Sequence, residues 1–220
     1  LTIGAGVTYS ESQDAIREAF PHLGEYWDRI AGWQVRNMGT IGGNIANGSP
    51  IGDTPPVLIS LGAEVTLASA SGTRSLPLEE IFIDYGKQDR KAGDFVSSIR
   101  IPRAKSNQID AAYKISKRRD EAISSVAAGF SVTIKDDTIT QACVAFGGMA
   151  ATPKRAAAAE AALIGQPWNA ATFDAAAKAL AQDFAPLTDW RASAEYRLLV
   201  AGNLLRRFQL EHDTAYDAQA

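Results

Sequence analysis

The residues best suited to bind a ligand fall in one stretch, 36–56, where five of the chain's 18 glycines alternate with small polar residues. Neither an amphipathic helix nor a half-buried strand fits this pattern, so the sequence predicts a surface loop system. Gly42 and Gly43 would let a ligand approach the backbone closely. This stretch, the glycine loop, predicts a cradle for an anion or for a ligand with many acceptor atoms. The donors would be the backbone amides of residues 40–47 and the side chains of Thr40, Asn44 and Asn47.

The same stretch has an alternative explanation as a long turn that merely joins two elements. Loops longer than about 12–15 residues are usually functional or disordered. Ile41, Ile45 and Ile51 are spaced through the loop and argue against disorder. Composition alone therefore leaves the turn and the ligand cradle both open.

A second distinctive stretch is the run of five consecutive charges at 117–121. On its own, such a run predicts a solvated turn. The sequence holds no nucleophile–histidine pattern and no phosphate-loop lysine. His22 and His212 are far apart and stand beside no carboxylate or cysteine pattern. We therefore assign this chain no catalytic side chain and no metal ligand.

Composition argues against several classes of protein. A net charge of −3 does not favour a nucleic-acid or anionic-membrane surface. No apolar run approaches the roughly 20 residues of a membrane span, and no signal peptide is recognisable, so we expect a cytoplasmic protein. The single cysteine, Cys143, excludes an internal disulfide and falls short of the about four thiolates that an iron–sulfur cluster takes. Because the chain begins at Leu1 with a strand-like segment, we expect a fragment or one piece of a larger assembly.

Periodicity and cap signals predict short elements in the first half of the chain. The expected strands span 1–9, 63–68 and 95–101. The expected helices are one capped by Ser10 and two others at 23–32 and 57–62, with a short helix or irregular segment at 76–83.

The second half has a more regular pattern of apolar residues. Alternating apolar positions predict an antiparallel hairpin with strands at 126–134 and 139–146. Three helices should follow, the first with Thr152 as cap and Pro153 as first residue, the others capped by Asn169 and Ser193. Strands followed by helices predict an α+β domain with a small antiparallel sheet packed on three helices. We divide the chain into residues 1–103, residues 107–213 and a tail, 214–220.

Three motifs in order carry a resemblance to a known family. The segment 40–53 (TIGGNIANGSPIGD) closely resembles the flavin-binding loop of xanthine dehydrogenase small subunits, which belong to the molybdenum hydroxylases. The segments 114–123 (KISKRRDEAI) and 146–156 (FGGMAATPKRA) also match that family. The resemblance runs end to end. It implies that 1–103 is the second half of a two-subdomain, PCMH-type FAD-binding domain and 107–213 a CO dehydrogenase flavoprotein-like C-terminal domain.

The resemblance also implies a set of site residues. The expected contacts with FAD are made by Ile30, Ala31, Thr40, Gly43, Asn44, Asn47, Asp53, Val96 and Lys114. On the side of the electron acceptor, NAD, the expected residues are Ser49, Arg119 and Glu121. Two alternatives stay open: Asp53 could cap the following helix, and Val96 could be a buried strand valine. Many relatives carry a further acid after Glu121, where this chain has Ala122.

What the resemblance implies about function is electron transfer within a larger enzyme. Oxidation of hypoxanthine or xanthine to urate at a molybdenum centre would send electrons through iron–sulfur clusters to FAD and then to NAD. The expected partners are a molybdenum-binding large subunit, the iron–sulfur domains and the missing N-terminal half of the FAD domain, in a hetero-oligomer. The rivals are the flavin subunit of another molybdenum hydroxylase, of the CO or nicotinate dehydrogenase type, and a fragment that only docks and assembles.

Overall fold

A side-chain cap sets where the first helix of the chain begins. The computed structural model describes residues 1–213, and the predicted tail at 214–220 lies outside the described residues. In α1 (Tyr9–Ala19), Thr8 and Glu11 form a reciprocal capping box, so the cap is Thr8 and not the expected Ser10. The helical segments that follow are η1 (Pro21–Leu23), α2 (Gly24–Asp28), α3 (Trp33–Arg36), α4 (Ile41–Asn47) and α5 (Thr54–Ser60).

An antiparallel sheet supports these helices, with strands in the order β1-β6-β2-β3. Its members are β1 (Thr2–Gly4), β2 (Glu64–Ser69), β3 (Gly72–Pro77) and β6 (Phe95–Arg100). The turn η2 (Leu78–Ile81) leads into a two-stranded hairpin of β4 (Phe82–Asp84) and β5 (Lys87–Gln88). Apolar side chains from the sheet and the short helices form one buried cluster, centred on residues such as Trp27, Ile45 and Leu58.

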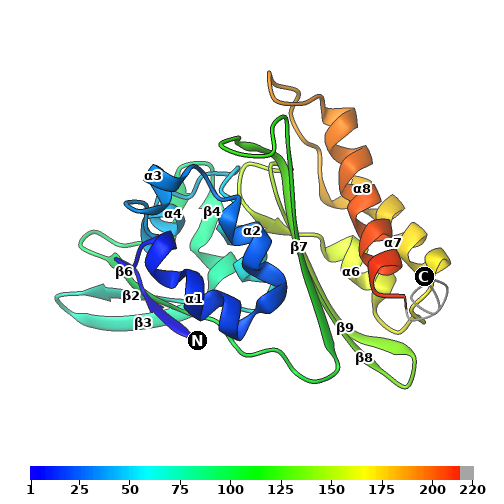
Figure 1. Cartoon of the computed structure of the whole chain (residues 1–220), viewed down its shortest axis with the longest axis horizontal. Helices are drawn as coiled ribbons and strands as arrows, with labels where there is room; N and C mark the ends of the chain where they lie inside the picture. The colour runs from blue at the N-terminus through cyan, green and yellow to red at the C-terminus, as the bar shows by residue number, and fades with distance from the viewer. Residues whose placement is uncertain (214–220) are drawn as a thin grey trace.

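A second antiparallel sheet follows, in the order β10-β9-β8-β7. It contains β7 (Gln108–Ser116), β8 (Ser124–Lys135), β9 (Thr138–Gly147) and β10 (Lys154–Arg155). Figure 1 shows α6 (Ala157–Leu163), α7 (Ala170–Asp183) and α8 (Ala194–Glu211) together on one side of it. Phe208 of α8 lies between Phe130 and Trp168, with ring centroids 5.5 and 5.3 Å away, at the centre of a second apolar cluster. The α+β class with helices on an antiparallel sheet is thus confirmed.

The two halves meet because α5 packs directly on the other face of the second sheet. Gly129 in β8 makes this possible, since a Cβ there would lie 2.6 Å from the Pro56 carbonyl oxygen. Gly147 at the end of β9 faces the Pro50 and Gly52 carbonyl oxygens, and the Gly148 amide donates to the Pro50 carbonyl at 2.7 Å. The second sheet therefore forms the floor beneath the glycine loop.

Several predicted elements differ from the structure. Only residues 2–4 of the expected strand 1–9 pair with β6, and the helix expected at 23–32 is limited to α2. Residues 154–155 pair with β9 as β10, so Thr152 and Pro153 do not start a helix and α6 begins at Ala157. The expected list also missed β3 and β7. The hairpin, the strands near 63–68 and 95–101, and the caps at Asn169 and Ser193 are confirmed.

Candidate functional site

The glycine loop contains a helix that its composition was expected to exclude. Thr40 caps α4, since its Oγ1 accepts a hydrogen bond from the Gly43 amide at 3.0 Å. Ile41 and Ile45 are four residues apart and both fully buried, so they anchor the helix to the core. Gly48, with φ of +63°, ends it. Two buried isoleucines and two good caps thus outweigh the low helix propensity of the glycines.

Most backbone amides of this helix's first turn bond within the protein. The Ile41 amide donates to the Val7 carbonyl at 3.3 Å and the Gly42 amide to the Ala5 carbonyl at 3.1 Å. Gly42 is required for that approach, because a Cβ there would overlap Ala5. These two amides of the predicted cradle therefore bond within the protein, so the donors that we consider for a ligand are side chains.

Those side chains line a cleft of about 880 Å³, which we call the main cleft. Its walls come from the segment that follows α2, from the glycine loop and from the turn between β7 and β8. The structure brings nine of the twelve predicted site residues to this cleft: Ile30, Ala31, Thr40, Gly43, Asn44, Asn47, Ser49, Asp53 and Glu121. Their roles as ligand contacts stay predictions.

A hydrogen-bond chain fixes the orientation of Asn44. The Tyr9 hydroxyl lies 3.3 Å from Thr54 Oγ1, which donates to Asn44 Oδ1 at 2.7 Å. Because the carbonyl oxygen of Asn44 is occupied, its amide nitrogen is left to donate into the cleft. Burial raises the pKa of Tyr9 above its ordinary value, so this hydroxyl stays protonated as part of the chain. The neighbouring Asn47 side chain has no hydrogen-bond partner among the described residues.

Backbone strain gathers at one rim of the main cleft. Among the described residues, Ala31 and Glu121 are non-glycine residues with φ near +50°, and both line it. Arg36 Nη1 donates to the Ile30 and Ala31 carbonyls at 3.0 and 2.8 Å and so holds that turn. The two strained segments meet, because a Cβ on Gly32 would lie 2.7 Å from the Glu121 carboxylate.

Three predicted residues lie outside the main cleft. Val96 is 8% exposed in β6 and packs in the first apolar cluster. Arg119 forms an ion pair with Glu25 at 2.9 Å, in which both side chains are 71% exposed. Lys114 is buried in β7 behind the cleft wall.

The buried Lys114 belongs to a compact polar network. Its Nζ donates to Asp53 Oδ2 at 2.6 Å and to Ser124 Oγ at 3.0 Å, and Ser124 Oγ donates to Asp53 Oδ1 at 2.6 Å. Both carboxylate oxygens of Asp53 are therefore engaged. Asp53 makes no side-chain cap of α5, so the alternative role considered for it is wrong. The network joins the glycine loop to β7 and β8.

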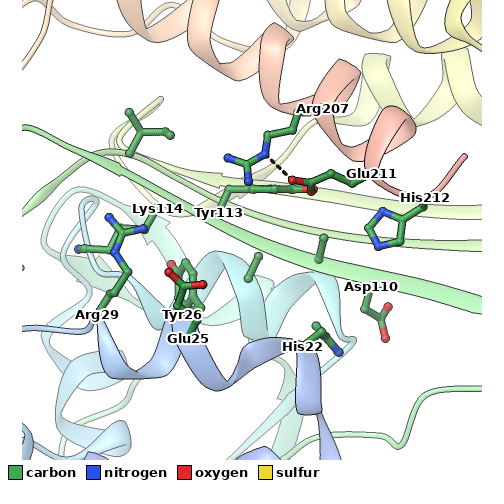
Figure 2. Close-up of a pocket in the computed structure, with 13 residues that line it drawn as sticks. His22, Glu25, Tyr26, Arg29, Asp110, Tyr113, Lys114, Arg207, Glu211 and His212 are labelled. Carbon is green, nitrogen blue, oxygen red and sulfur yellow. Dashed lines mark hydrogen bonds and ion pairs between the residues drawn. The ribbon is translucent and has the colours of Figure 1, made fainter. Parts of the chain in front are cut away.

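Lys114 also borders a second, smaller cavity of about 270 Å³, shown in Figure 2. This cavity lies among α2, β7 and the C-terminal end of α8. His22 and His212 line it on either side of Asp110 (Figure 2). Burial lowers the pKa of His22, with the Asp110 charge acting in the opposite direction. The Lys114–Asp53 pair thus stands between the two cavities.

The described residues offer little reactive chemistry of their own. In residues 1–213, no group of three or more His, Cys, Asp or Glu side chains is placed to hold a metal ion. Burial raises the pKa of the Cys143 thiol to about 12, which keeps it protonated and unreactive. No helix in the described part of the chain is long and apolar enough to span a membrane.

Sequence reasoning missed several residues that shape the site. Tyr9 and Thr54 orient Asn44, Ser124 completes the Asp53 network, and Arg36 holds the strained turn. Each acts across a large sequence separation or through a backbone carbonyl. Spacing in the sequence carries no signal for such contacts.

Two family profiles cover nearly the whole described chain. The profile for the FAD binding domain in molybdopterin dehydrogenase matches residues 1–104. The profile for the CO dehydrogenase flavoprotein C-terminal domain matches residues 111–212. The first match contains the buried residues of the first apolar cluster except Ala145, and the second match contains those of the second cluster.

Individual proteins show the same likeness. A nicotinate hydroxylase of Emericella nidulans is 36% identical over 81% of this chain and 14% of its own length. A xanthine dehydrogenase/oxidase of Gallus gallus is 32% identical over 82% of this chain and 14% of its own length. The solved structure of a reconstituted CO dehydrogenase from Oligotropha carboxidovorans superposes with a TM-score of 0.86 at 30% identity, covering 94% of this chain and 72% of that one. The chain thus spans about a seventh of the first two relatives.

Proposed function

The chain belongs to the FAD-binding flavoproteins of the molybdenum hydroxylase family, and on that premise we propose that its main cleft holds FAD and delivers electrons to NAD. The single observation that carries the proposal is the cleft itself, which collects nine predicted site residues from separate segments. In the enzyme, the electrons would come from iron–sulfur clusters and a molybdenum centre on other domains or subunits.

The residues of the main cleft fit this cofactor. FAD combines a flat apolar ring with a ribityl chain and a pyrophosphate, which are rich in acceptor oxygens. The cleft offers Ile30 and Ala31 on one wall and the side chains of Thr40, Asn44 and Asn47 on another. The Asn44 amide nitrogen and the Asn47 side chain are free of protein partners among the described residues, so both can bond to acceptor oxygens.

When bound, FAD supplies the transfer of electrons between the clusters and the acceptor. The chain's own residues bind it and set the electrostatic field around it. Asp53 faces the cleft, but Lys114 neutralises it at 2.6 Å. An unpaired anion beside the flavin would oppose its reduction. The ion pair with Lys114 therefore lowers the electrostatic cost of adding electrons to the flavin. Ser49, Arg119 and Glu121 would contact the acceptor, and Val96 would act by packing.

For the substrate, we favour oxidation of hypoxanthine and xanthine to urate. Support comes from the three motifs and from the similarity to a xanthine dehydrogenase/oxidase. The similarity to a nicotinate hydroxylase makes a nitrogen heterocycle of the pyridine type the second candidate. In either case the enzyme would be a cytoplasmic hetero-oligomer with a molybdenum-binding large subunit, iron–sulfur domains and the N-terminal half of the FAD domain. The division at 1–103 and 107–213 remains part of this proposal.

The experiment measures flavin bound to the complete enzyme that contains this chain. Asn44→Asp places a negative charge where a donor faces the cofactor's acceptor oxygens, so we expect at least a tenfold loss of FAD affinity, equivalent to about 1.4 kcal/mol. Asn203→Asp on the exposed side of α8 adds the same charge far from the cleft and should leave FAD affinity unchanged. Equal affinity in wild type and Asn44→Asp, by calorimetry, would remove the glycine loop from the FAD site.

The rival hypothesis, a fragment that only docks and assembles, makes a different prediction. The isolated chain would then stay colourless after incubation with FAD and desalting. Retained flavin absorption would contradict it and would show that these residues suffice for binding.

A further inference from the structure

Asn47, one of the predicted FAD contacts, is not held in place by its own side chain. It is the last residue of α4, it is exposed, and its amide has no hydrogen-bond partner among the described residues. It lines the main cleft and also a cavity of about 540 Å³ beside the β4–β5 hairpin, which we call the hairpin cavity. The position of the Asn47 side chain therefore depends on the backbone of the last turn of α4.

The last turn of α4 is weak on its own. Two of the seven residues in this helix are glycine, which has the lowest helix propensity after proline. The last carbonyls of a helix have no partner within it, and the last turn of α4 contains no basic side chain to balance the helix dipole. Apart from the amide of Gly48, the donors for these carbonyls must come from other segments.

The end of the β4–β5 hairpin supplies these donors. Gln88 Nε2 donates to the Ile45 carbonyl at 2.8 Å, and Arg90 Nη2 donates to the Ala46 carbonyl at 3.1 Å. These two carbonyls directly precede Asn47 in the chain. The Arg90 guanidinium also places a positive charge at the C-terminal end of α4, where the helix dipole favours one.

Arg90 also determines which way the Gln88 amide points. Arg90 Nε donates to Gln88 Oε1 at 2.7 Å, so this oxygen is occupied and the amide nitrogen is turned to the helix. Gly48 leaves room for the amide, because a Cβ at Gly48 would lie 2.6 Å from Gln88 Nε2. Gln88 and the end of α4 therefore fit closely against each other.

The hairpin is anchored to the first sheet. Arg74 of β3 forms ion pairs with Asp89 at 2.7 Å and with Asp94 at 3.2 Å. The Asp89 amide donates to the Ile81 carbonyl at 2.9 Å. Because Asp89 stands between Gln88 and Arg90 in the sequence, these contacts fix the backbone that carries both donors. The last turn of α4 is thus linked through the hairpin to β3.

We propose that Gln88 and Arg90 are positioning residues of the FAD site, which hold the last turn of α4 so that the Asn47 amide faces the cofactor. The inference rests on the proposed function and adds two residues that do not line the main cleft. Without their hydrogen bonds, the last turn of α4 loosens and Asn47 leaves its place at the cleft. FAD then loses one neutral hydrogen-bond donor.

The test measures the Kd for FAD by calorimetry in the apoenzyme of the complete enzyme. Asn47→Ala should raise the Kd about fivefold, which corresponds to one neutral hydrogen bond. Gln88→Ala should raise it about threefold, and by no more than Asn47→Ala does. The double variant should have the Kd of Asn47→Ala alone, because Gln88 acts only through Asn47. A merely structural role for Gln88 would instead weaken FAD binding equally in both backgrounds.

Arg90 provides a second, milder variant that does not threaten the fold, because its side chain is exposed. Arg90→Ala should raise the Kd for FAD about twofold in the wild-type background and have no effect in Asn47→Ala. Arg90→Lys keeps the positive charge and should restore part of the affinity. Gln182→Ala is the matched control for Gln88→Ala, since Gln182 is exposed on α7 and lines neither cavity.

The outcomes separate the inference from the proposed function. Additive losses from Gln88→Ala and Asn47→Ala, or a wild-type Kd in either single variant, would overturn the inference. The proposed function would still stand if Asn44→Asp weakens FAD binding in the same assay. If Asn44→Asp and Asn47→Ala both bind FAD as the wild type does, the glycine loop is not the FAD site, and the proposed function and the inference fail together.

Discussion

Replacing Lys114 by Met tests whether the buried ion pair supports the cleft wall. The Lys114 side chain is fully buried, Asp53 is 12% exposed, and their charged atoms are 2.6 Å apart. Met keeps the length of the side chain but removes the ammonium, which leaves the Asp53 carboxylate with Ser124 as its remaining side-chain donor. Breaking a buried ion pair lowers the free energy of unfolding by about 3–5 kcal/mol. Because Asp53 is partly exposed, we expect a loss of about 3 kcal/mol. For a domain of this size that loss lowers Tm by roughly 6–12 °C.

The assay is thermal unfolding of the FAD-loaded enzyme, followed by release of flavin fluorescence. The double variant Lys114→Met with Asp53→Asn should regain much of the lost Tm, because no unpaired charge remains. Arg119→Met removes a cation from an exposed pair and should leave Tm nearly unchanged. The reasoning is refuted if Lys114→Met behaves like Arg119→Met, or if the double variant loses the sum of both single effects.

The same variants separate two roles for Lys114. If Lys114 acts on FAD through Asp53, FAD affinity recovers along with Tm in the double variant. If Lys114 contacts FAD directly, as the resemblance predicts, FAD affinity stays low in the double variant even where Tm recovers. Calorimetric titration of FAD into apoenzyme at a temperature below every Tm distinguishes the two.

Three further predictions concern residues that hold the backbone in place around the site. Gly42→Ala should destabilise the fold by about 1–3 kcal/mol in urea unfolding, because its Cβ overlaps the turn after β1, whereas Gly6→Ala meets open space and should not. Arg36→Gln should weaken FAD binding with little change in stability, because the carbonyls of the strained turn at Ala31 lose their donor; Arg36→Lys should restore part of it. The third concerns the carboxyl group of Asp189. Partial burial acts to raise its pKa, but hydrogen bonds from two backbone amides and a guanidinium lower this pKa to about 2. Its stabilising contribution is therefore complete above pH 3.8 and is lost as the pH falls towards 2, so Asp189→Asn should flatten that part of the plot of Tm against pH.

Helix caps and short-range hydrophobic patterns allowed part of the fold to be predicted from the sequence. The helix capped by Ser193 was predicted from that cap, and the cap is present in α8. The hairpin of β8 and β9 followed from strict alternation, with Asp136 and Asp137 both at positive φ in its turn. Such elements are set by neighbours within a few residues, which the sequence displays directly.

Other features depended on contacts between distant segments. Thr152 and Pro153 look like a helix start, but pairing of residues 154–155 with β9 prevails there. The glycine loop was expected to lack a helix, because the burial of Ile41 and Ile45 against the core could not be read from composition. Thr40, Asn44 and Asn47 were named from the composition of the glycine loop, and the other cleft residues through the resemblance. The bonds that orient them, such as that of Thr54 to Asn44, join segments that no periodicity connects.

The glycines of the segment 146–156 show why the cleft needs both halves of the chain. Gly147 has no side chain where Pro50 and Gly52 approach, and Gly148, with φ of +81°, donates to the Pro50 carbonyl. A Cβ at Gly147 would lie 3.3 Å from the Gly52 carbonyl oxygen and 3.4 Å from that of Pro50, so a larger side chain there would press against the glycine loop near Asp53. The motif around Gly147 therefore acts on the site without touching a ligand. The main cleft therefore takes lining residues from both halves of the chain, and the sheet of the second half supports the glycine loop from below.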